Sequence, residues 1–416
     1  MSALPLSVSA ERVCGQLDEL AAISDAPAPA VTRVLFTPTD LRGRAFIKQL
    51  MEDTGLAFRV DAAGNLFGRW IGSEPNLPAV ATGSHCDAIP HSGRYDGTVG
   101  VIGAMEAVVA LRAAGFQPRR SIDVIMFNAE EPTRYGIGCL GSRIMSGRLS
   151  PEAAAELRDQ NGETFETTRV NAGCKGKLPS VRLSRGKYQA FVELHIEQGP
   201  ILEQQNLPIG IVTAIAAPAA FRVTFQGEGG HAGAVLMRDR KDALLAAAEL
   251  TIAVEQAAKE LGGVDTVATV GILDVHPHAI NSIPSRAEMT VDVRDIELER
   301  RDMVLVVIKR YAAEVAENRQ IKMQLEMINA DPPAKCDSRV IAEISAAAQE
   351  AKLTALPMIS RAYHDSLFMA LIAPTSMIFI PCRGGVSHRP DEYASPEAIC
   401  GGIEVLARTL ARLSHA

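Results

Sequence analysis

The sequence lacks the features that mark several classes of protein. Residues 1–24 contain Glu11, Arg12, Asp18 and Glu19 and no long apolar core, so we expect neither a signal peptide nor a membrane span there. The seven cysteines are scattered, odd in number and form no CxxC pair, so reduced thiols in a cytoplasmic compartment are expected. The net charge of -7 argues against nucleic acid or an anionic membrane as the main partner.

Length and composition are typical of a large globular enzyme. The chain has 416 residues and 47% hydrophobic content, which is enough to bury more than one core. No internal repeat or low-complexity tract is present. The length therefore predicts more than one domain.

Four short apolar runs are each followed by acidic residues or histidine. They are read as buried strands over residues 78–82, 122–127, 189–194 and 377–380. In order, they lead into His85, Glu130-Glu131, His195 and His388. Because sites in open α/β sheets form outside the carboxyl ends of the strands, these residues are expected to share one edge.

A helix is expected between the first two of these strands. Asp96-Gly97 precedes residues 99–112, whose pattern is helical and ends near Gly115. Strand, helix and strand form a βαβ unit, which normally lies in a parallel sheet. Asp96 is therefore expected close to the same edge.

The pattern changes near residue 214. Strands are expected over 221–225, 266–273, 287–293 and 321–327, and helices over 241–261 and 298–317. Their order is βαββαβ, the ferredoxin-like arrangement. We therefore predict a discontinuous ligand-bearing domain over 1–213 and 329–416, with 214–328 inserted as a second domain. Residues 150–187, rich in charged residues, Gly and Ser, are expected to form surface connections.

The candidate ligands suit a hydrolytic centre for one or two divalent ions. Carboxylates and imidazoles are ligands of such ions, and a shared carboxylate can hold two of them roughly 3.5–4 Å apart. Asp96 is the best candidate for that bridge. His85 and His195 would complete one site, and Glu131 and His388 the other.

Three neighbouring residues would support this chemistry or pack beside it. Asp87 can accept the other ring N–H of His85 and orient it. Glu130 remains free to act as general base and then general acid. Cys86 is read as a small buried residue rather than a nucleophile, since no histidine base is paired with it.

Several motifs resemble the hydantoinase/carbamoylase branch of the dinuclear metallo-amidohydrolases, relatives of the zinc exopeptidases. The segments that carry the resemblance are residues 83–87, 93–97, 130–131, 193–200 and 230–233. The resemblance implies an α/β fold: a zinc-exopeptidase-like catalytic domain with a mostly parallel central sheet, plus an inserted ferredoxin-like lid. Two chains would form a homodimer through this lid. It also implies two divalent ions per subunit, with Mn²⁺ the usual metal and Zn²⁺ chemically suitable.

The same resemblance assigns roles to single residues. Its metal positions fall on His85, Asp96, Glu131, His195 and His388, with Glu130 as the base. A histidine at position 195, where related peptidases use an acid, points away from peptide hydrolysis.

The resemblance also implies a small ureido acid as substrate. Gln198, Asn281 and Arg294 would contact it, and the planar guanidinium of Arg294 suits a carboxylate. Arg294 could instead pair only with Asp292 or Asp295. His231 would reach the neighbouring subunit's site and steady charge on the scissile carbonyl oxygen.

One segment distinguishes subgroups of this branch. Carbamoylases and allantoate amidohydrolases carry a Gly-Ala-Gly-His-Asp-Ala string, whereas residues 361–369 here resemble the ureidoglycolate amidohydrolases. Tyr363 fills space and adds a hydroxyl, which suits a smaller, hydroxylated substrate, and Tyr363 and His364 either contact substrate or pack. The expected reaction converts (S)-ureidoglycolate to glyoxylate, ammonia and carbon dioxide. Allantoate, an N-carbamoyl-L-amino acid, peptide hydrolysis and a non-catalytic binding protein remain alternatives.

Overall fold

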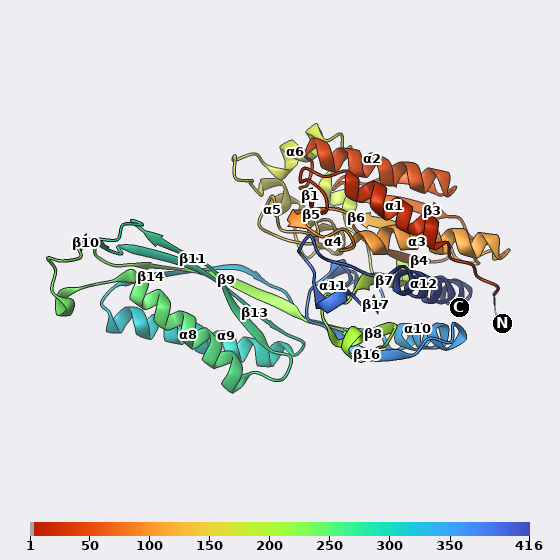
Figure 1. Cartoon of the computed structure of the whole chain (residues 1–416). Helices are drawn as coiled ribbons and strands as arrows, with labels where there is room; N and C mark the ends of the chain where they lie inside the picture. The colour runs from red at the N-terminus through yellow and green to blue at the C-terminus, as the bar shows by residue number, and fades with distance from the viewer. Residues whose placement is uncertain (1–3) are drawn as a thin grey trace. The chain divides into compact units, whose positions relative to one another are not determined.

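The chain folds into two units in the computed structural model, which describes residues 4–416 (Figure 1). The first unit comprises the chain up to Ala214, Cys336–Ser360 and His364–Ala416, and the second comprises Ile215–Lys335 and Arg361–Tyr363. The return boundary lies later than we expected. Strand β14 (Lys322–Ala330) continues past residue 328, and the N–H of Asp331 then donates to the carbonyl of Pro218 at 3.2 Å. Residues 329–335 therefore belong to the second unit.

The first unit is built on one large sheet with a parallel centre. The strands of this unit are β1 (Val31–Arg33), β2 (Ala57–Val60), β3 (Leu66–Trp70), β4 (Ala79–His85), β5 (Ala88–Ser92), β6 (Ile122–Phe127), β7 (Tyr188–Ile196), β8 (Ile209–Ile215), β16 (Ala355–Ser360) and β17 (Thr375–Ile380). Strands β17, β7, β4 and β6 run parallel in that spatial order. Strand β8 joins β17 antiparallel, and β3 and β2 continue antiparallel beyond β6. The predicted α/β fold with a mostly parallel central sheet is confirmed.

Helices cover both faces of this sheet. They are α1 (Ala10–Ala22), α2 (Pro38–Asp53), α3 (Thr98–Ala113), α4 (Leu140–Ser146), α5 (Pro151–Glu156), α6 (Phe165–Asn171), α7 (Ile201–Gln204), α10 (Ser338–Glu350), α11 (Asp365–Met369) and α12 (Pro396–His415), with short 3₁₀ turns η1 (Leu178–Val181) and η3 (Arg383–Gly385). Successive strand residues point to opposite faces, so Val124 packs in the core with α3, α10 and α12, and Ile125 in the core with α4, α5 and α6. Helices α2, α5 and α12 each begin with a capping Ser or Thr followed by proline, which favours a helix start at that point.

The segment 150–187 is more structured than we expected. It forms α5, α6 and η1, and Phe165, Leu178 and Val181 are buried in the core beneath them. The prediction of surface connections was wrong, because a few apolar residues spaced among charged ones are enough to anchor short helices.

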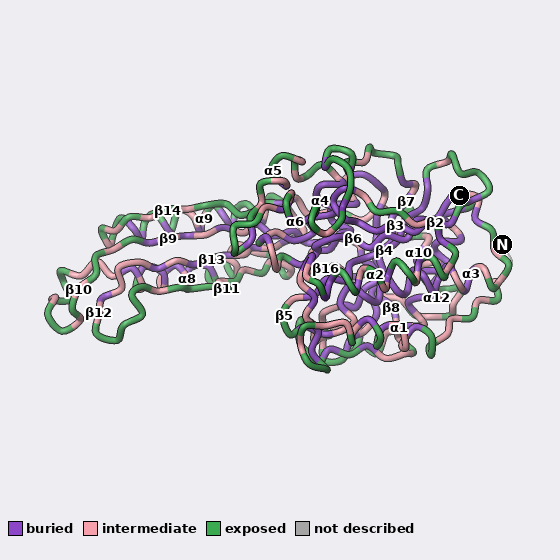
Figure 2. The backbone as a smooth tube through the Cα atoms, turned by 90° about the horizontal axis from the view of Figure 1, so that it is seen from above, coloured by how far each residue is buried: buried purple, intermediate pink, exposed green. Residues whose placement is uncertain are grey.

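The second unit is a four-stranded antiparallel sheet with two helices on one face. Its elements are β9 (Ala217–Gln226), β10 (Gly230–His231), η2 (Met237–Asp239), α8 (Ala243–Leu261), β11 (Val267–His276), β12 (Ser282–Ile283), β13 (Arg286–Asp295), α9 (Leu298–Asn318), β14 and β15 (Ala334–Lys335). The spatial order is β11-β13-β9-β14, the ferredoxin-like order. Along β9, the buried Phe221, Val223 and Phe225 alternate with the more exposed Arg222 and Thr224, and Figure 2 shows the same alternation of burial along these strands.

Among residues 4–416, no helix is long and apolar enough to cross a membrane.

Candidate metal centre

The five residues predicted to bind metal lie together at one edge of the first unit's sheet. His85 ends β4, His195 is the residue before the end of β7, Glu131 follows β6, and His388 follows β17. Asp96 lies just before α3. The four strands are parallel, so their carboxyl ends meet at this edge.

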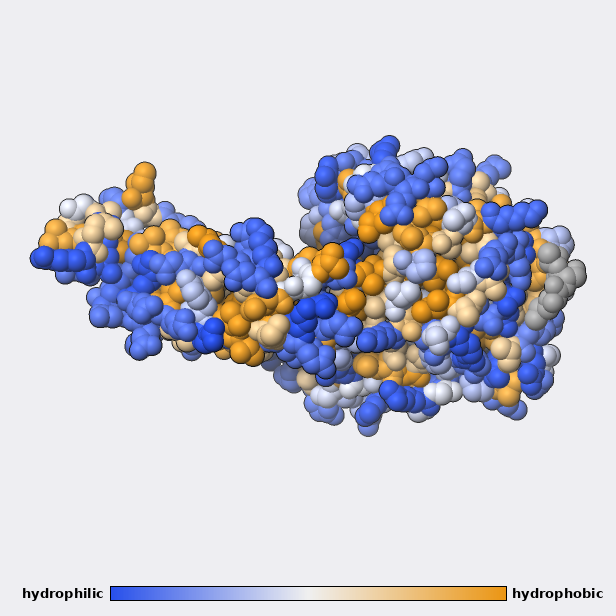
Figure 3. Space-filling view, turned by 90° about the horizontal axis from the view of Figure 1, so that it is seen from below, coloured by the Kyte–Doolittle hydropathy of each residue, from blue (hydrophilic) through white to orange (hydrophobic). Residues whose placement is uncertain are grey.

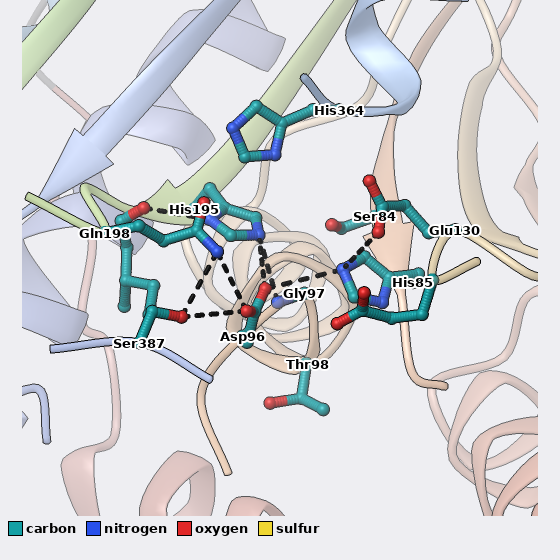
Figure 4. A network of polar contacts seen from close by, with 12 residues as sticks. Ser84, His85, Asp96, Gly97, Thr98, Glu130, His195, Gln198, His364 and Ser387 are labelled. Atoms are coloured by element: carbon teal, nitrogen blue, oxygen red, sulfur yellow. Dashed lines mark hydrogen bonds and ion pairs between the residues drawn. The ribbon is translucent and has the colours of Figure 1, made fainter. Parts of the chain in front are cut away.

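The five side chains form two groups that share Asp96. One group is His85, Asp96 and His195, and the other is Asp96, Glu131 and His388; the ligand atoms in each lie within 4.8 Å of one another. Asp96 Oδ1 is 3.1 Å from His195 Nε2 and 3.5 Å from His85 Nε2. Asp96 Oδ2 is 3.1 Å from His388 Nε2, which is 3.4 Å from Glu131 Oε1. Figure 4 shows Asp96 between His85 and His195, with dashed lines to both rings.

The orientation of two imidazoles fits a cation at this centre. His195 Nδ1 lies 2.8 Å from the carbonyl oxygen of Ile196, while its Nε2 accepts the N–H of Gly97 at 3.1 Å. His85 Nδ1 likewise lies 3.1 Å from the carbonyl oxygen of Asp87. In a neutral ring these contacts place the proton on Nδ1 and leave the Nε2 lone pair facing a carboxylate. Lone pairs and carboxylates directed at one point are the donor set of a divalent cation.

The electrostatics of the groups support the same reading. Burial would raise the pKa of Asp96, but its hydrogen bonds with His195 and His388 hold that pKa well below its usual value. The hydrogen bond with Asp96 raises the pKa of His388 to about 9, and burial raises the pKa of Glu131 to about 7, helped by the charge of Asp96. A divalent cation would displace the protons that such groups otherwise hold.

Glu130 is buried beside the first group. Its Oε2 lies 3.7 Å from His85 Nε2, and its Oε1 accepts a hydrogen bond from the Cys139 thiol at 3.3 Å. Burial raises the pKa of Glu130 well above its usual value, and the negative charge of Glu131 adds to the shift. A carboxyl group in this environment can accept a proton and hold it.

Asp87 joins the ends of β4 and β6. Its carboxylate accepts the backbone N–H groups of Glu130 at 3.2 Å and Glu131 at 2.9 Å. Its Oδ1 lies 3.6 Å from His85 Nδ1, farther than its own carbonyl oxygen. Asp87 thus orients His85 mainly through its backbone, and its side chain positions the Glu130-Glu131 pair.

Close packing around His85 leaves no room for a side chain at position 97. A Cβ at Gly97 would lie 2.4 Å from the His85 ring, and Gly97 has a φ of +66°. Cys86 is buried as expected, and burial raises the pKa of its thiol to about 12, so the thiol remains protonated.

Two predicted substrate contacts lie in the first unit. Gln198 donates from Nε2 to Asp96 Oδ2 at 2.8 Å and to Ser387 Oγ at 3.2 Å. Its buried Oε1 has no hydrogen-bond partner within residues 4–416. His364 is buried, with its ring centroid 4.5 Å from that of His195 and its Nε2 3.1 Å from Ser360 Oγ.

The other predicted contacts lie in the second unit, at two separate places. His231 and Asn281 are exposed neighbours around the paired strands β10 and β12, whereas Arg294 lies at the far end of β13 beside Tyr363, whose ring centroid is 5.5 Å from the guanidinium carbon. At about 3.4 Å per residue, β13 from Arg286 to Arg294 spans on the order of 27 Å. The structure therefore does not bring Asn281 and Arg294 of one chain to the same carboxylate.

Arg294 already has a partner. It pairs with Asp292 through Nε–Oδ1 at 2.8 Å and Nη2–Oδ2 at 3.3 Å, one of the alternatives that the sequence left open. A substrate carboxylate would have to share or replace this pairing.

Sequence reasoning missed several buried acids around the centre. Glu392 accepts the backbone N–H groups of Tyr95 and Asp96, and Glu193 accepts hydrogen bonds from the hydroxyls of Ser84 and Ser366. Glu392 follows shortly after His388 in the sequence. A carboxylate so near a candidate ligand in the sequence was the signal that could have found it.

Comparison with known proteins agrees with this arrangement. The profile of peptidase family M20/M25/M40 matches residues 81–412. The chain is 54% identical to ureidoglycolate hydrolase of Arabidopsis thaliana, over 98% of this chain and 87% of that protein. Crystal structures of AtUAH in complex with glyoxylate and with (S)-hydroxyglycine each superpose with a TM-score of 0.94 at 53% identity, covering all of both chains.

A more distant solved structure places the chain within a branch of that family. An amidase of the hydantoinase/carbamoylase family from Burkholderia vietnamiensis has a TM-score of 0.90 at 31% identity, covering 99% of this chain and 98% of that one. The chain therefore belongs to peptidase family M20/M25/M40, and within it to the hydantoinase/carbamoylase branch.

Proposed function

We propose that the protein is a metal-dependent amidohydrolase that cleaves the carbamoyl C–N bond of (S)-ureidoglycolate. The observation that carries this proposal is the pair of ligand groups sharing Asp96, with Glu130 buried beside them. The similarity to ureidoglycolate hydrolase and to the complexes with glyoxylate and (S)-hydroxyglycine supports the choice of substrate. Water addition at the carbamoyl carbon would release carbamate, which yields ammonia and carbon dioxide, and (S)-hydroxyglycine, which loses ammonia to give glyoxylate.

The five converging side chains would hold two divalent ions. His85, Asp96 and His195 would bind one, and Asp96, Glu131 and His388 the other. Mn²⁺ is our first choice and Zn²⁺ the second, since imidazole and carboxylate suit both. When bound, the pair would supply positive charge that polarises the carbonyl oxygen and lowers the pKa of a nearby water.

Glu130 would move the protons of the reaction. It would take a proton from the attacking water at one carboxylate oxygen and deliver it to the leaving nitrogen. Its position suits this, because its carboxylate is buried beside the first ligand group, 3.7 Å from His85 Nε2. Gln198 would accept an N–H of the ureido group at Oε1, the acceptor that has no partner within residues 4–416.

We further propose that the protein is a homodimer, joined through the second unit, in which each chain completes the partner's site. Strand β11 is an edge strand, and β11 and the neighbouring α8 expose apolar side chains: Leu245, Ile252, Val267, Ile272 and Leu273. Figure 3 shows that apolar patches lie among hydrophilic residues on one face of this unit. Association would bury them.

A dimer also explains why the predicted contacts lie far apart. His231 Nδ1 accepts the N–H of Gly233 at 3.1 Å, so a neutral ring carries its proton on Nε2 and can donate it to a carbonyl oxygen. We propose that His231 serves the partner's site, and that Asn281, Arg294, Tyr363 and His364 contact substrate, with Asn281 and Arg294 of one chain contacting different substrate molecules. The cysteines are free, which agrees with a cytoplasmic location.

The test of this function combines a substrate assay with removal of the base. Ammonia release is measured from (S)-ureidoglycolate, allantoate and an N-carbamoyl-L-amino acid after loading with Mn²⁺ or Zn²⁺, and we expect ureidoglycolate to give the highest kcat/KM. Glu130→Ala should lower kcat by roughly 10²–10⁴-fold with metal content unchanged, since it removes the proton carrier but no ligand. Retained turnover in this variant would contradict the assignment of the base. A metal-loaded wild type that hydrolyses none of the three compounds would contradict the function itself.

A further inference from the structure

Glu392 ties the loop that carries Asp96 to the loop that carries His388. Its Oε1 accepts the backbone N–H of Tyr95 at 2.7 Å and that of Asp96 at 3.1 Å. Its Oε2 lies 2.9 Å from Ser387 Oγ, and Ser387 Oγ lies 2.9 Å from Asp96 Oδ2. These contacts close a ring that holds Asp96 at both its backbone and its carboxylate, directly beside His388.

The glycine at position 93 leaves room for this ring of hydrogen bonds. A Cβ at Gly93 would lie 2.3 Å from the Glu392 carboxyl carbon and 2.4 Å from its Cβ. Only a residue without a side chain therefore fits at position 93 while Glu392 keeps its place. The rings of Tyr95 and Tyr393 meet edge to face beside it, with centroids 6.1 Å apart. Glu392 itself is only 5% exposed.

We propose that Glu392 is a positioning residue that fixes the shared carboxylate Asp96 relative to His388, and that Gly93 is needed because its absent side chain makes space for Glu392. The proposal rests on the proposed function, since it assumes that Asp96 and His388 bind metal. Glu392 acts through hydrogen bonds to Tyr95, Asp96 and Ser387, and it need not touch metal or substrate.

This role makes a specific distinction between two substitutions. The amide of Glu392→Gln can accept both backbone N–H groups at its oxygen and donate to Ser387 Oγ from its nitrogen, so the ring stays closed. Glu392→Ala leaves the N–H groups of Tyr95 and Asp96 without this acceptor. Gly93→Ala opens the ring from the other side, because it displaces Glu392 without changing it.

The experiment titrates metal-depleted protein with Mn²⁺ and measures the dissociation constants by calorimetry. Glu392→Ala and Gly93→Ala should each weaken Mn²⁺ binding by roughly 10–100-fold, the usual effect of losing a residue that orients a ligand. Glu392→Gln should stay within about threefold of the wild type, because its oxygen still accepts both backbone N–H groups and its nitrogen keeps the contact with Ser387 as a donor in place of an acceptor. Gly15→Ala is the matched control, since a Cβ there would meet no atom within 4 Å.

Several outcomes would overturn the inference. Wild-type affinity in both Glu392→Ala and Gly93→Ala would show that the ring does not position Asp96. A Glu392→Gln variant as weak as Glu392→Ala would show that charge, and not hydrogen bonding, is what the site requires. If Glu392→Ala does not fold, judged by circular dichroism without metal, Ser387→Ala replaces it and should also weaken binding. A wild-type protein that binds neither Mn²⁺ nor Zn²⁺ would overturn the proposed function, and this inference with it.

Discussion

The two units place polar residues differently because their sheets differ in direction. In the first unit, β17, β7, β4 and β6 are parallel, and residues far apart in sequence meet where these strands end. In the second unit all strand pairs of the four-stranded sheet are antiparallel, and His231 and Arg294 lie at opposite ends. Convergence on one site is thus a property of the parallel sheet, whereas the antiparallel unit can present groups at two separated places.

Burial differs in the same way. Every residue of β4, β6 and β17 is buried, which is usual for parallel strands covered on both faces. Along β9 and β13 buried and more exposed residues alternate. His195 is fully buried, whereas His231 is exposed. Charges at the first unit's centre therefore interact in a drier environment, where their effect is stronger.

The largest expected effect comes from removing the carboxylate that both ligand groups share. Asp96→Ala should lower kcat/KM by at least roughly 10⁴-fold, or about 5 kcal/mol of transition-state stabilisation, because both groups lose a ligand at once. Metal analysis and steady-state kinetics measure the two consequences together. The matched control is Glu255→Ala on α8, which removes an exposed ion pair with Lys259 and should change stability by less than about 1 kcal/mol. Metal content unaffected by Asp96→Ala would contradict the view that the parallel strand ends of the first unit form one shared metal site.

The sequence predicted the parts of the molecule that depend on local pattern. The apolar runs ending at His85 and His195 are strands buried on both faces, and the second unit's strands and helices follow the expected βαββαβ order. The convergence of five candidate ligands followed from these strands and is observed, while their metal-binding role stays a prediction. Arg294 and Asp292, two residues apart, are close enough in sequence for their pairing to be weighed in advance.

The missed features depend on contacts between distant segments. Glu392 meets the backbone of Asp96 across 296 positions of sequence, and Cys139 meets Glu130 only because its loop folds back on that residue. Nothing in local periodicity marks such contacts. The separation of Asn281 from Arg294 was not foreseen, because the resemblance gave both residues as substrate contacts and nothing in it showed that the extended strand β13 lies between them.

The second prediction tests whether the end of the second unit that carries His231 serves the partner's site. His231→Ala should lower kcat by roughly 10²–10³-fold without loss of metal, the usual effect of removing one donor to a developing oxyanion. Mixing this variant with Asp96→Ala should restore part of the activity, because one mixed dimer combines an intact metal centre with an intact His231 from its partner. Activity that stays at the level of the single variants, in samples shown to exchange subunits, would contradict the shared site.

The smallest expected effect is the stabilisation of the folded chain by metal, which should differ between the two units. An ion that binds only the folded first unit stabilises it by about 2.7 kcal/mol at a concentration of 100 times its Kd, equivalent to roughly 100-fold slower hydrogen exchange where exchange requires unfolding of that unit. We therefore expect added Mn²⁺ to slow exchange in β4, β6 and β7 but not in β9 and β14, whose sheet holds none of the candidate ligands within residues 4–416. Peptide-resolved mass spectrometry measures both groups of strands in one sample, and Asp96→Ala should abolish the difference between them. Equal protection of both groups of strands would mean that the units unfold as one body, and that metal binding at the parallel edge is transmitted to the antiparallel sheet.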